Sequence, residues 1–173
     1  MCHRASRSLR EYAVRGSRRF CGVIAQGHLP NRKISYHWAV QHTITIRVRY
    51  PEVDGMGYLH HSRFLQYFEM GRVELLRSLG HAYADLEREG VFFVVVKAAI
   101  NYKAPARYDD ELTLITTVVK QTHVRIDHAY ELKRGDTQLA EGTTTIACVG
   151  SDGQLRQIPE TLSSNDEIRN SNQ

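Results

Sequence analysis

The 173-residue sequence has little of what membrane proteins and disulfide-rich proteins depend on. Its longest apolar run is the six-residue segment 91–96, far short of the roughly 20 residues that cross a bilayer. Its three cysteines, Cys2, Cys21 and Cys148, are scattered and show no C-x-x-C spacing. We therefore expect a protein of a reducing compartment, the cytoplasm, with no disulfide framework, no zinc site and no membrane contact.

Several common catalytic motifs are also missing. There is no G-x-S-x-G elbow and no Walker loop, and His60 stands where a dinucleotide fingerprint needs its third glycine. No two histidines are four residues apart, so helical zinc ligation is not predicted and we expect no metal. Three later histidines are interpreted as surface or sheet-face residues: His81, His123 and His128. These absences set aside serine-elbow, P-loop and dinucleotide chemistry.

The net charge of +4 is unevenly distributed along the chain. Residues 1–41 hold eight Lys and Arg against one acid, a net +7, so the remaining residues carry −3. This leader lacks the apolar core of a secretory signal, and its Arg- and Ser-rich composition fits a transit peptide or a nucleic-acid-binding arm. We interpret it first as a basic, disordered leader, and we expect no nucleic-acid partner.

Hydrophobic periodicity predicts one strand, one long helix and then a run of strands. The first strand covers 43–50, where polar and apolar residues alternate up to Pro51, and the helix runs from an N-cap at Ser62 to about Leu79. Apolar residues at three- and four-residue spacing predict a buried helix face that only Arg72 interrupts. That face consists of Leu65, Phe68, Arg72, Leu75, Leu76 and Leu79.

After a short turn at 82–89, strands separated by Gly- and Asp-bearing turns are predicted. They cover 91–102, 111–121, 124–134, 138–149 and a short stretch near 155–158. The apolar first half of 91–102 is expected to be buried on both faces. This order predicts an α+β domain over 42–160, a helix on a mostly antiparallel sheet, followed by a polar tail over 161–173. Because such a sheet leaves open edges, we expect a homo-oligomer.

Asp54 is the sharpest functional candidate. It lies in a glycine-bearing loop before the predicted helix, whose first turn offers unpaired backbone amides. Taken alone, Asp before Gly indicates only a turn. Beside a helix N-terminus, its ionised carboxylate can take a proton from water or attack directly, while the amides hold an oxyanion. His61 is the companion candidate, through its backbone amide or its ring, unless it only caps the loop.

Charged residues outside the loop give weaker signals. Glu69 is interpreted first as an ion-pair partner of Arg72, three residues further on, with support of the site as the alternative. Lys103 and Arg107 lie on or near later strands. Such cations suit a substrate with several phosphates, although scattered Lys and Arg are usually a solvated face.

Two stretches of the sequence carry a family resemblance. The first runs from Arg49-Tyr-Pro-Glu-Val-Asp54 through Gly57 to His61, seven residues after the acid, and continues through 64–76. The second is 100–110. Together they resemble the 4-hydroxybenzoyl-CoA thioesterase-like hotdog superfamily, particularly its short bacterial acyl-CoA thioesterases. The likeness covers about residues 42–160.

The resemblance implies a hotdog fold, in which an antiparallel sheet wraps around one long central helix, assembled as a homodimer or homotetramer. It implies hydrolysis of an acyl-CoA thioester to a carboxylic acid and CoA. No cofactor is expected, and coenzyme A takes part only as a portion of the substrate. Asp54 falls on the family's catalytic acid, and His61 on the position whose amide polarises the carbonyl. The residues expected to contact the substrate are Gly57, Tyr58, His60, Glu69, Lys103 and Arg107.

Two positions depart from the family pattern. His60 stands where members often carry an aromatic residue, and Met56 occupies a site that is commonly small, so the acyl preference stays open. Three alternatives also remain: a thioesterase acting on acyl carrier protein, a hotdog dehydratase, and a non-catalytic acyl-CoA-binding regulator. The dehydratase is disfavoured because no His-Phe-Pro loop leads into the helix.

Overall fold

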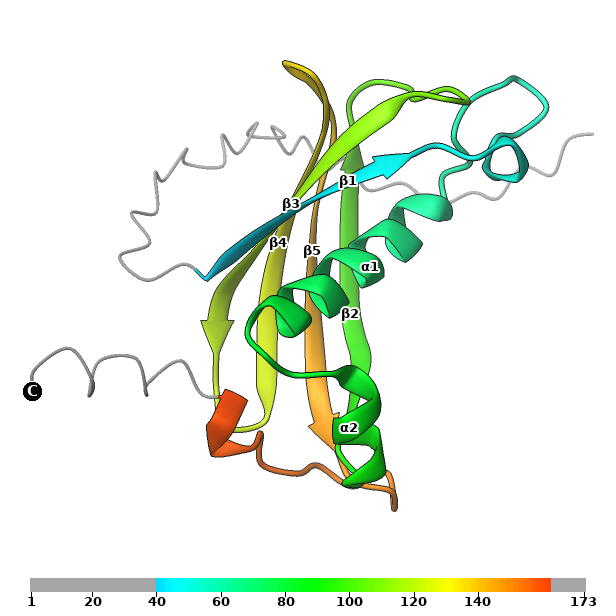
Figure 1. The fold of residues 1–173 in the computed structure, drawn as a ribbon. Helices are drawn as coiled ribbons and strands as arrows, with labels where there is room; N and C mark the ends of the chain where they lie inside the picture. Colours follow the sequence, from blue (N-terminus) through cyan, green and yellow to red (C-terminus); the bar gives the residue numbers. More distant parts are fainter. Residues whose placement is uncertain (1–39, 163–173) are drawn as a thin grey trace, which may run out of the picture. The chain divides into compact units, whose positions relative to one another are not determined.

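A five-stranded antiparallel sheet and a long helix dominate the part of the chain that this computed structural model describes, residues 40–162 (Figure 1). The strands are β1 (Gln41–Arg47), β2 (Phe92–Tyr102), β3 (Glu111–Gln121), β4 (Arg125–Arg134) and β5 (Thr137–Val149). The helices are α1 (Arg63–Ser78) and α2 (Tyr83–Arg88), with short 3-10 turns η1 (Tyr50–Glu52) and η2 (Glu160–Leu162). The strand order is β1-β3-β4-β5-β2, and each neighbouring pair is antiparallel.

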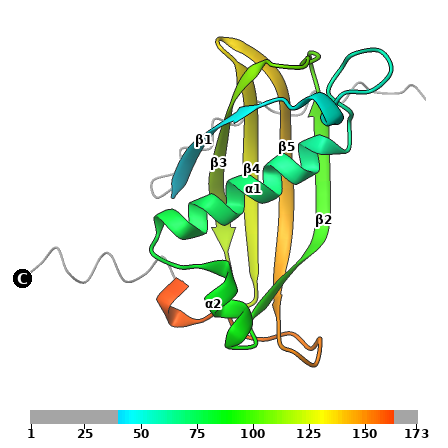
Figure 2. The same ribbon diagram turned by 45° about the vertical axis from the view of Figure 1, so that its right-hand side comes forward.

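Helix α1 lies across one face of the sheet, with β1 and β2 at the two edges (Figure 2). The side of α1 that faces the sheet carries Phe64, Tyr67, Phe68, Gly71 and Leu75, all buried. The Phe68 ring stacks on Tyr130 of β4, with ring centroids 4.3 Å apart. The predicted α+β architecture, one long helix packed on an antiparallel sheet, is therefore confirmed.

Most predicted element boundaries agree with the structure to within one or two residues, and β3 agrees at both ends. Gly80 ends α1 with a φ of +88°, and Gly135 in the β4–β5 hairpin has a φ of +55°. Both conformations lie in the left-handed region that glycine tolerates without a steric penalty. Local turn chemistry thus marked these element ends correctly.

The predicted buried face of the helix is wrong at two positions. Leu65 and Leu79 are 43% and 46% exposed, whereas Phe64 and Tyr67 are buried. The face that meets the sheet is rotated toward Phe64, Tyr67 and Gly71, so the two leucines stay largely accessible to solvent.

The predicted strand near 155–158 is also absent. Leu155 forms only an isolated bridge with Val149, and the chain then enters η2. A single bridge at the end of β5 leaves too few paired residues to extend the sheet.

Strand β2 is far more exposed than predicted. Val94, Val95 and Val96 are 42%, 48% and 54% exposed, so the expected burial on both faces is wrong. The physical reason is position: β2 is an edge strand, and within residues 40–162 it pairs only with β5. An apolar edge strand of this kind is open to pairing with another chain.

Gly71 lets α1 approach β3 closely. A Cβ atom placed there would overlap the Thr116 hydroxyl and lie 2.8 Å from Cδ2 of Leu114. We expect Gly71→Ala to lower the free energy of unfolding by about 1–3 kcal/mol, although alanine gains about 1 kcal/mol in helix propensity. Gly55→Ala is the control, because a Cβ at Gly55 has no heavy atom within 4 Å. Equal urea midpoints for the two variants would contradict this close packing.

A titratable residue lies on the inner face of the sheet. His128 of β4 is only 3% exposed. Burial lowers the pKa of its imidazole to about 4, with help from the positive charge of Arg72 and against the attraction of Asp127. The neutral ring is therefore the form that the folded protein favours.

This depressed pKa predicts acid sensitivity. The unfolded chain, with a histidine pKa near 6.5, binds more protons than the folded chain between pH 6.5 and 4, so stability falls as the pH is lowered through that window. At pH 5 the expected loss is about 2 kcal/mol relative to pH 7.5. Urea unfolding at several pH values measures it, and His128→Gln is expected to flatten this part of the curve. An unchanged slope in that variant would assign the acid sensitivity to other groups.

Candidate active site

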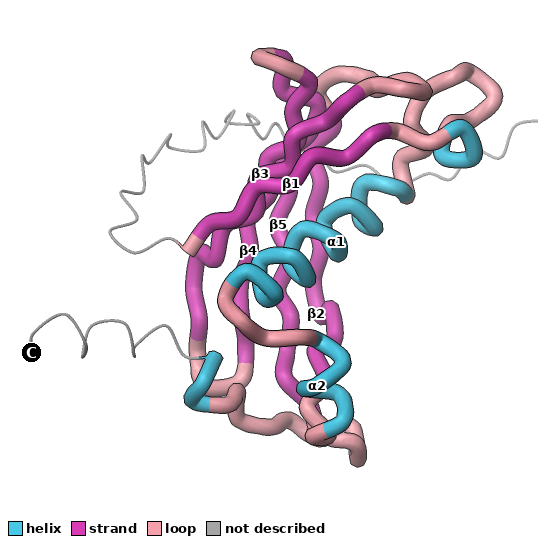
Figure 3. The backbone as a smooth tube through the Cα atoms, viewed as in Figure 1, coloured by secondary structure: helices cyan, strands magenta, loops and turns pink. Residues whose placement is uncertain are grey.

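The loop before α1 is a small closed turn built around Asp54. Val53 and Leu59 form an isolated antiparallel bridge, and the Asp54 amide donates to the carbonyl of Tyr58 at 2.8 Å. The Gly57 amide donates to the carbonyl of Asp54 at 2.9 Å, and Gly57 adopts a φ of +75°. The loop and α2 lie at opposite ends of α1 (Figure 3). Gly57 closes the turn just before α1, because glycine adopts this positive φ without a steric penalty.

The Asp54 carboxylate is half-buried and held on one side only. Its Oδ1 accepts hydrogen bonds from the backbone amides of Met56 at 2.8 Å and Tyr58 at 3.2 Å. Within residues 40–162, its other oxygen accepts no hydrogen bond and no cation pairs with it. One oxygen is thus fixed by the turn, while the other is left to accept a proton.

His61 contributes a free backbone amide at the start of α1. Within the described part of the chain, its NH donates no hydrogen bond, while its carbonyl accepts one from the Tyr102 hydroxyl at 3.1 Å. Its ring is exposed and lies 4.1 Å from the ring of His60, measured between centroids. The Tyr102 contact was not predicted, and it fixes the peptide that follows His61.

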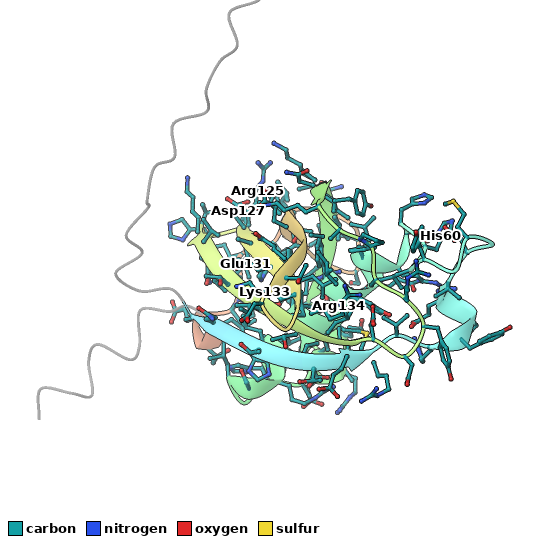
Figure 4. All side chains as sticks on the ribbon, turned by 90° about the horizontal axis from the view of Figure 1, so that it is seen from above. His60, Arg125, Asp127, Glu131, Lys133 and Arg134 are labelled. Atoms are coloured by element: carbon teal, nitrogen blue, oxygen red, sulfur yellow. The ribbon has the colours of Figure 1, made fainter. Side chains whose placement is uncertain are left out.

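The helix begins differently from the predicted N-cap. Ser62 already has helical φ and ψ of −68° and −21°, and its side chain makes no capping bond. Its hydroxyl instead pairs with Nδ1 of His60 at 2.8 Å. The capping role predicted for Ser62 is therefore wrong. Figure 4 shows His60 at the loop end of the domain, well apart from the labelled charged residues of β4.

Some of the predicted substrate contacts come together and others do not. The Arg107 guanidinium lies 4.6 Å from the centre of the Tyr58 ring and donates to its hydroxyl at 3.3 Å, close beside Gly57. Lys103 instead pairs with Glu141 of β5 at 2.7 Å. Gly57, Tyr58 and Arg107 therefore lie together at the loop, whereas the Lys103 ammonium is held in an ion pair with β5.

Glu69 lies on α1 and makes the ion pair that was predicted. Its carboxylate is 3.3 Å from Arg72, three residues further along the helix. The ion-pair interpretation is therefore confirmed. The Glu69 side chain is 63% exposed, so solvent screens much of this attraction.

A buried carboxylate beneath the loop was not predicted. Glu52 is 2% exposed and accepts hydrogen bonds from the Arg49 amide at 2.7 Å, from the Arg49 side chain at 2.6 and 3.0 Å, and from the Tyr67 hydroxyl at 2.7 Å. Its carbonyl accepts a hydrogen bond from the His60 amide at 2.9 Å. Glu52 thus ties both ends of the Asp54 loop to helix α1.

The hydrogen bonds to Glu52 decide its charge state. Burial by itself would raise the pKa of this carboxyl, but the hydrogen bonds from Arg49 and Tyr67 outweigh it and hold the pKa below its usual value. Burial and the adjacent carboxylate in turn raise the pKa of the Tyr67 hydroxyl. Glu52 is consequently an anion and Tyr67 a neutral donor at neutral pH. Only its place in Tyr-Pro-Glu, within the family-like stretch, offered a sequence signal for Glu52.

The described residues offer neither a metal cluster nor a membrane span. Between residues 40 and 162, no three His, Cys, Asp or Glu side chains gather as metal ligands would. In the same part of the chain, no helix is both long enough and apolar enough to cross a bilayer.

Comparison with known proteins decides the family. Residues 56–141 match the model of the thioesterase superfamily. The acyl-CoA thioesterase YbgC of Haemophilus influenzae is 35% identical over 105 residues, which is 60% of this chain and 77% of the relative. The acyl-CoA thioester hydrolase YbgC of Escherichia coli is 30% identical over 118 residues, 68% of this chain and 86% of the relative. This chain belongs to the thioesterase superfamily.

A solved structure extends the match to the fold. The DHNA-CoA thioesterase of Staphylococcus aureus superposes with a TM-score of 0.70 at 25% identity, covering 75% of this chain and 91% of the other. The hotdog fold and the family resemblance are thereby confirmed. The residues that match the thioesterase superfamily include His61, Glu69 and Arg107 but begin two positions after Asp54.

Proposed function

We propose that this thioesterase-superfamily protein is an acyl-CoA thioesterase that hydrolyses its substrate to a free carboxylic acid and CoA. The observation that carries the proposal is the half-buried Asp54 carboxylate, with one oxygen fixed by two amides and the other free. Two relatives with acyl-CoA thioesterase or acyl-CoA thioester hydrolase in their names support the substrate class.

The proposed mechanism uses Asp54 and the first amides of α1. The free oxygen of Asp54 takes a proton from water, and the water oxygen bonds to the thioester carbon. The carbonyl oxygen becomes an oxyanion that the His61 amide stabilises, and its collapse breaks the C–S bond and releases the thiolate of CoA. In the alternative route, Asp54 attacks the carbon itself, and water then hydrolyses the resulting anhydride. Single-turnover hydrolysis in ¹⁸O-water separates the routes, because only the anhydride route can leave ¹⁸O in Asp54.

We place the other substrate contacts around the same loop. Gly57 and His60 would border the thioester, and the stacked pair of Tyr58 and Arg107 would meet the pantetheine or phosphate part of CoA. Lys103 and Glu69 are weaker candidates, because each already forms an ion pair with a residue of its own chain.

The His61 side chain is expected to matter less than its backbone. His61→Ala keeps the amide that we assign to the oxyanion, so kcat should fall by no more than about tenfold. Steady-state kinetics with one acyl-CoA measures this. A loss as large as that of an Asp54 variant would instead assign the chemistry to the imidazole ring.

We further propose that the protein is a homo-oligomer, a homodimer at least, joined through the open edge of β2. The support is the exposed apolar run Val94–Val96 on an edge strand, which a second copy would cover and pair. Light scattering of the full chain tests this. A monomer at micromolar concentration would contradict the proposal, and Val95→Lys is expected to shift an oligomer toward monomer.

The proposed compartment is the cytoplasm, and no metal or redox cofactor takes part in the proposed chemistry. Cys148 is a free thiol buried at the end of β5, which suits a reducing environment. Full activity after exhaustive treatment with a chelator is the expected result, and loss that added metal restores would overturn the cofactor statement.

The decisive assay measures thiol release from a panel of acyl-CoA thioesters. The panel spans short, medium and long aliphatic chains and aromatic acyl groups, with matching acyl carrier protein thioesters. Turnover restricted to the carrier-protein series would favour that alternative. Tight acyl-CoA binding without turnover would identify a non-catalytic regulator and overturn the hydrolase assignment.

A further inference from the structure

A small, partly open cavity lies beneath the C-terminal half of α1, at the opposite end of that helix from the Asp54 loop. Its volume is about 60 Å³. Most of its wall is apolar and comes from α1, α2, the sheet and η2, with Leu75, Tyr83, Phe93, Val118, Ile126 and Leu162 among its residues. No residue of the loop 53–61 lines it, so the cavity is separate from the proposed active site.

Within residues 40–162, one ring nitrogen in the cavity wall has no hydrogen-bond partner, and a largely buried guanidinium lies in the same wall. Nδ1 of His128 is buried and has no hydrogen-bond partner within the described part of the chain. The Arg72 side chain is only 9% exposed, and its ion-pair partner is the largely exposed Glu69 carboxylate at 3.3 Å. The positive charge of this largely buried guanidinium is only partly balanced, because the Glu69 carboxylate is largely exposed to solvent. The cavity therefore combines an unsatisfied ring nitrogen, a largely buried positive charge and apolar walls.

We propose that this cavity binds a short-chain carboxylate of about two to four carbons, whose carboxylate meets Arg72 and His128 and whose alkyl end packs on the apolar wall. A carboxylate supplies an acceptor oxygen for the His128 ring and a negative charge beside the Arg72 guanidinium. Water would supply acceptors without charge, and a chloride ion would leave the apolar wall unfilled. The inference concerns binding alone and does not require the proposed hydrolysis.

The volume sets the size of the ligand. One water-sized group needs about 10–15 Å³ of such a cavity, so about 60 Å³ accommodates on the order of four to six heavy atoms. Acetate, propionate and butyrate have that size. An aromatic acid does not fit, because a cavity that holds benzene is on the order of 150 Å³.

The test follows the His128 ring in the full-length protein with ¹³C-labelled histidine. The His128 signal is assigned as the one that disappears in His128→Gln. Propionate, titrated at constant ionic strength against sodium chloride, is expected to shift this signal saturably. It should also raise the thermal midpoint by about 4 °C at ten times its dissociation constant. The same titration on Asp54→Asn should give the same affinity, which separates this site from the active site.

Variants and ligand analogues test each part of the proposal. Arg72→Lys, which keeps the charge but loses the planar fork, should bind propionate about tenfold more weakly, and uncharged propionamide should bind the native protein at least as poorly. Val118→Ile narrows the cavity without touching its polar groups and should weaken butyrate more than acetate. Val119→Ile, beside it on β3 and outside the cavity wall, should change nothing.

Three results would overturn the proposal: a His128 signal that propionate does not move, equal binding of propionamide, or equal loss of binding in both valine variants. Should Arg72→Lys fail to fold, the valine pair and the ligand series still decide. Benzoate binding as tightly as propionate would contradict the proposed ligand size.

Discussion

Replacing Asp54 with asparagine is expected to lower kcat/KM for acyl-CoA about a thousandfold while leaving the fold unchanged. Asparagine retains a side-chain oxygen that can accept the hydrogen bonds from the Met56 and Tyr58 amides, so the turn should close as before. What it lacks is the negative charge that takes a proton from water. Thiol release measures the activity, and circular dichroism with the urea midpoint verifies the fold.

The chain provides a matched control for this substitution. Asp152 sits in a similar turn, where its Oδ1 accepts a hydrogen bond from the Gln154 amide two residues further on at 3.0 Å. Asp152→Asn therefore makes the same chemical change in a similar local geometry, and it should keep full activity. Near-normal hydrolysis by Asp54→Asn would remove Asp54 from the mechanism, even if the protein proves to be a thioesterase.

The parts of the fold that depend on local sequence were predictable. Alternating residues in β1, the turn at Gly135 and the helix end at Gly80 each carry their own signal within a few residues. The loop acid was also accessible, because Asp54 stands between a strand-like and a helix-like stretch. In each case, the short-range preference of the backbone agrees with the tertiary structure.

The parts that depend on distant partners were not predictable. Leu65 and Leu79 fit the helical period, but the sheet selects the neighbouring face that contains Gly71, where the backbones approach closely. The valines of β2 predict a strand that is buried on both faces. Within residues 40–162, however, β2 lies at the edge of the sheet and has only one neighbouring strand, β5. Hydrophobic periodicity shows that one face of a helix or strand is apolar. The tertiary packing then determines which residues cover that face.

Glu52 is the clearest case of a residue whose role depends on tertiary contacts. A carboxylate after proline in an exposed turn would ordinarily be solvated, and nothing nearby in the sequence marks it as buried. The partner that buries it is Tyr67 on α1, fifteen residues away. Hydrogen bonds from Arg49 and Tyr67 make burial of this charge tolerable, and that constellation exists only once the helix has packed.

We expect Glu52→Ala to lower the free energy of unfolding by about 4 kcal/mol. The substitution removes the acceptor for the buried Tyr67 hydroxyl and for three donors of Arg49, and it leaves a cavity under the loop. Because the Glu52 carbonyl also anchors the His60 amide, the loop should lose its fixed position. Urea unfolding measures the stability, and the surviving folded protein should show a lower kcat.

Glu111→Ala is the matched control for Glu52→Ala. Glu111 also pairs with an arginine, Arg47, at 2.8 Å, but both side chains are more than half exposed. Solvent screens that pair, so its loss should cost less than about 1 kcal/mol. Tyr67→Phe should fall between the two, since Glu52 then keeps its bonds to Arg49. Equal costs for Glu52→Ala and Glu111→Ala would mean that water reaches the Glu52 carboxylate, and that the loop before α1 is held by its own turn rather than by the helix.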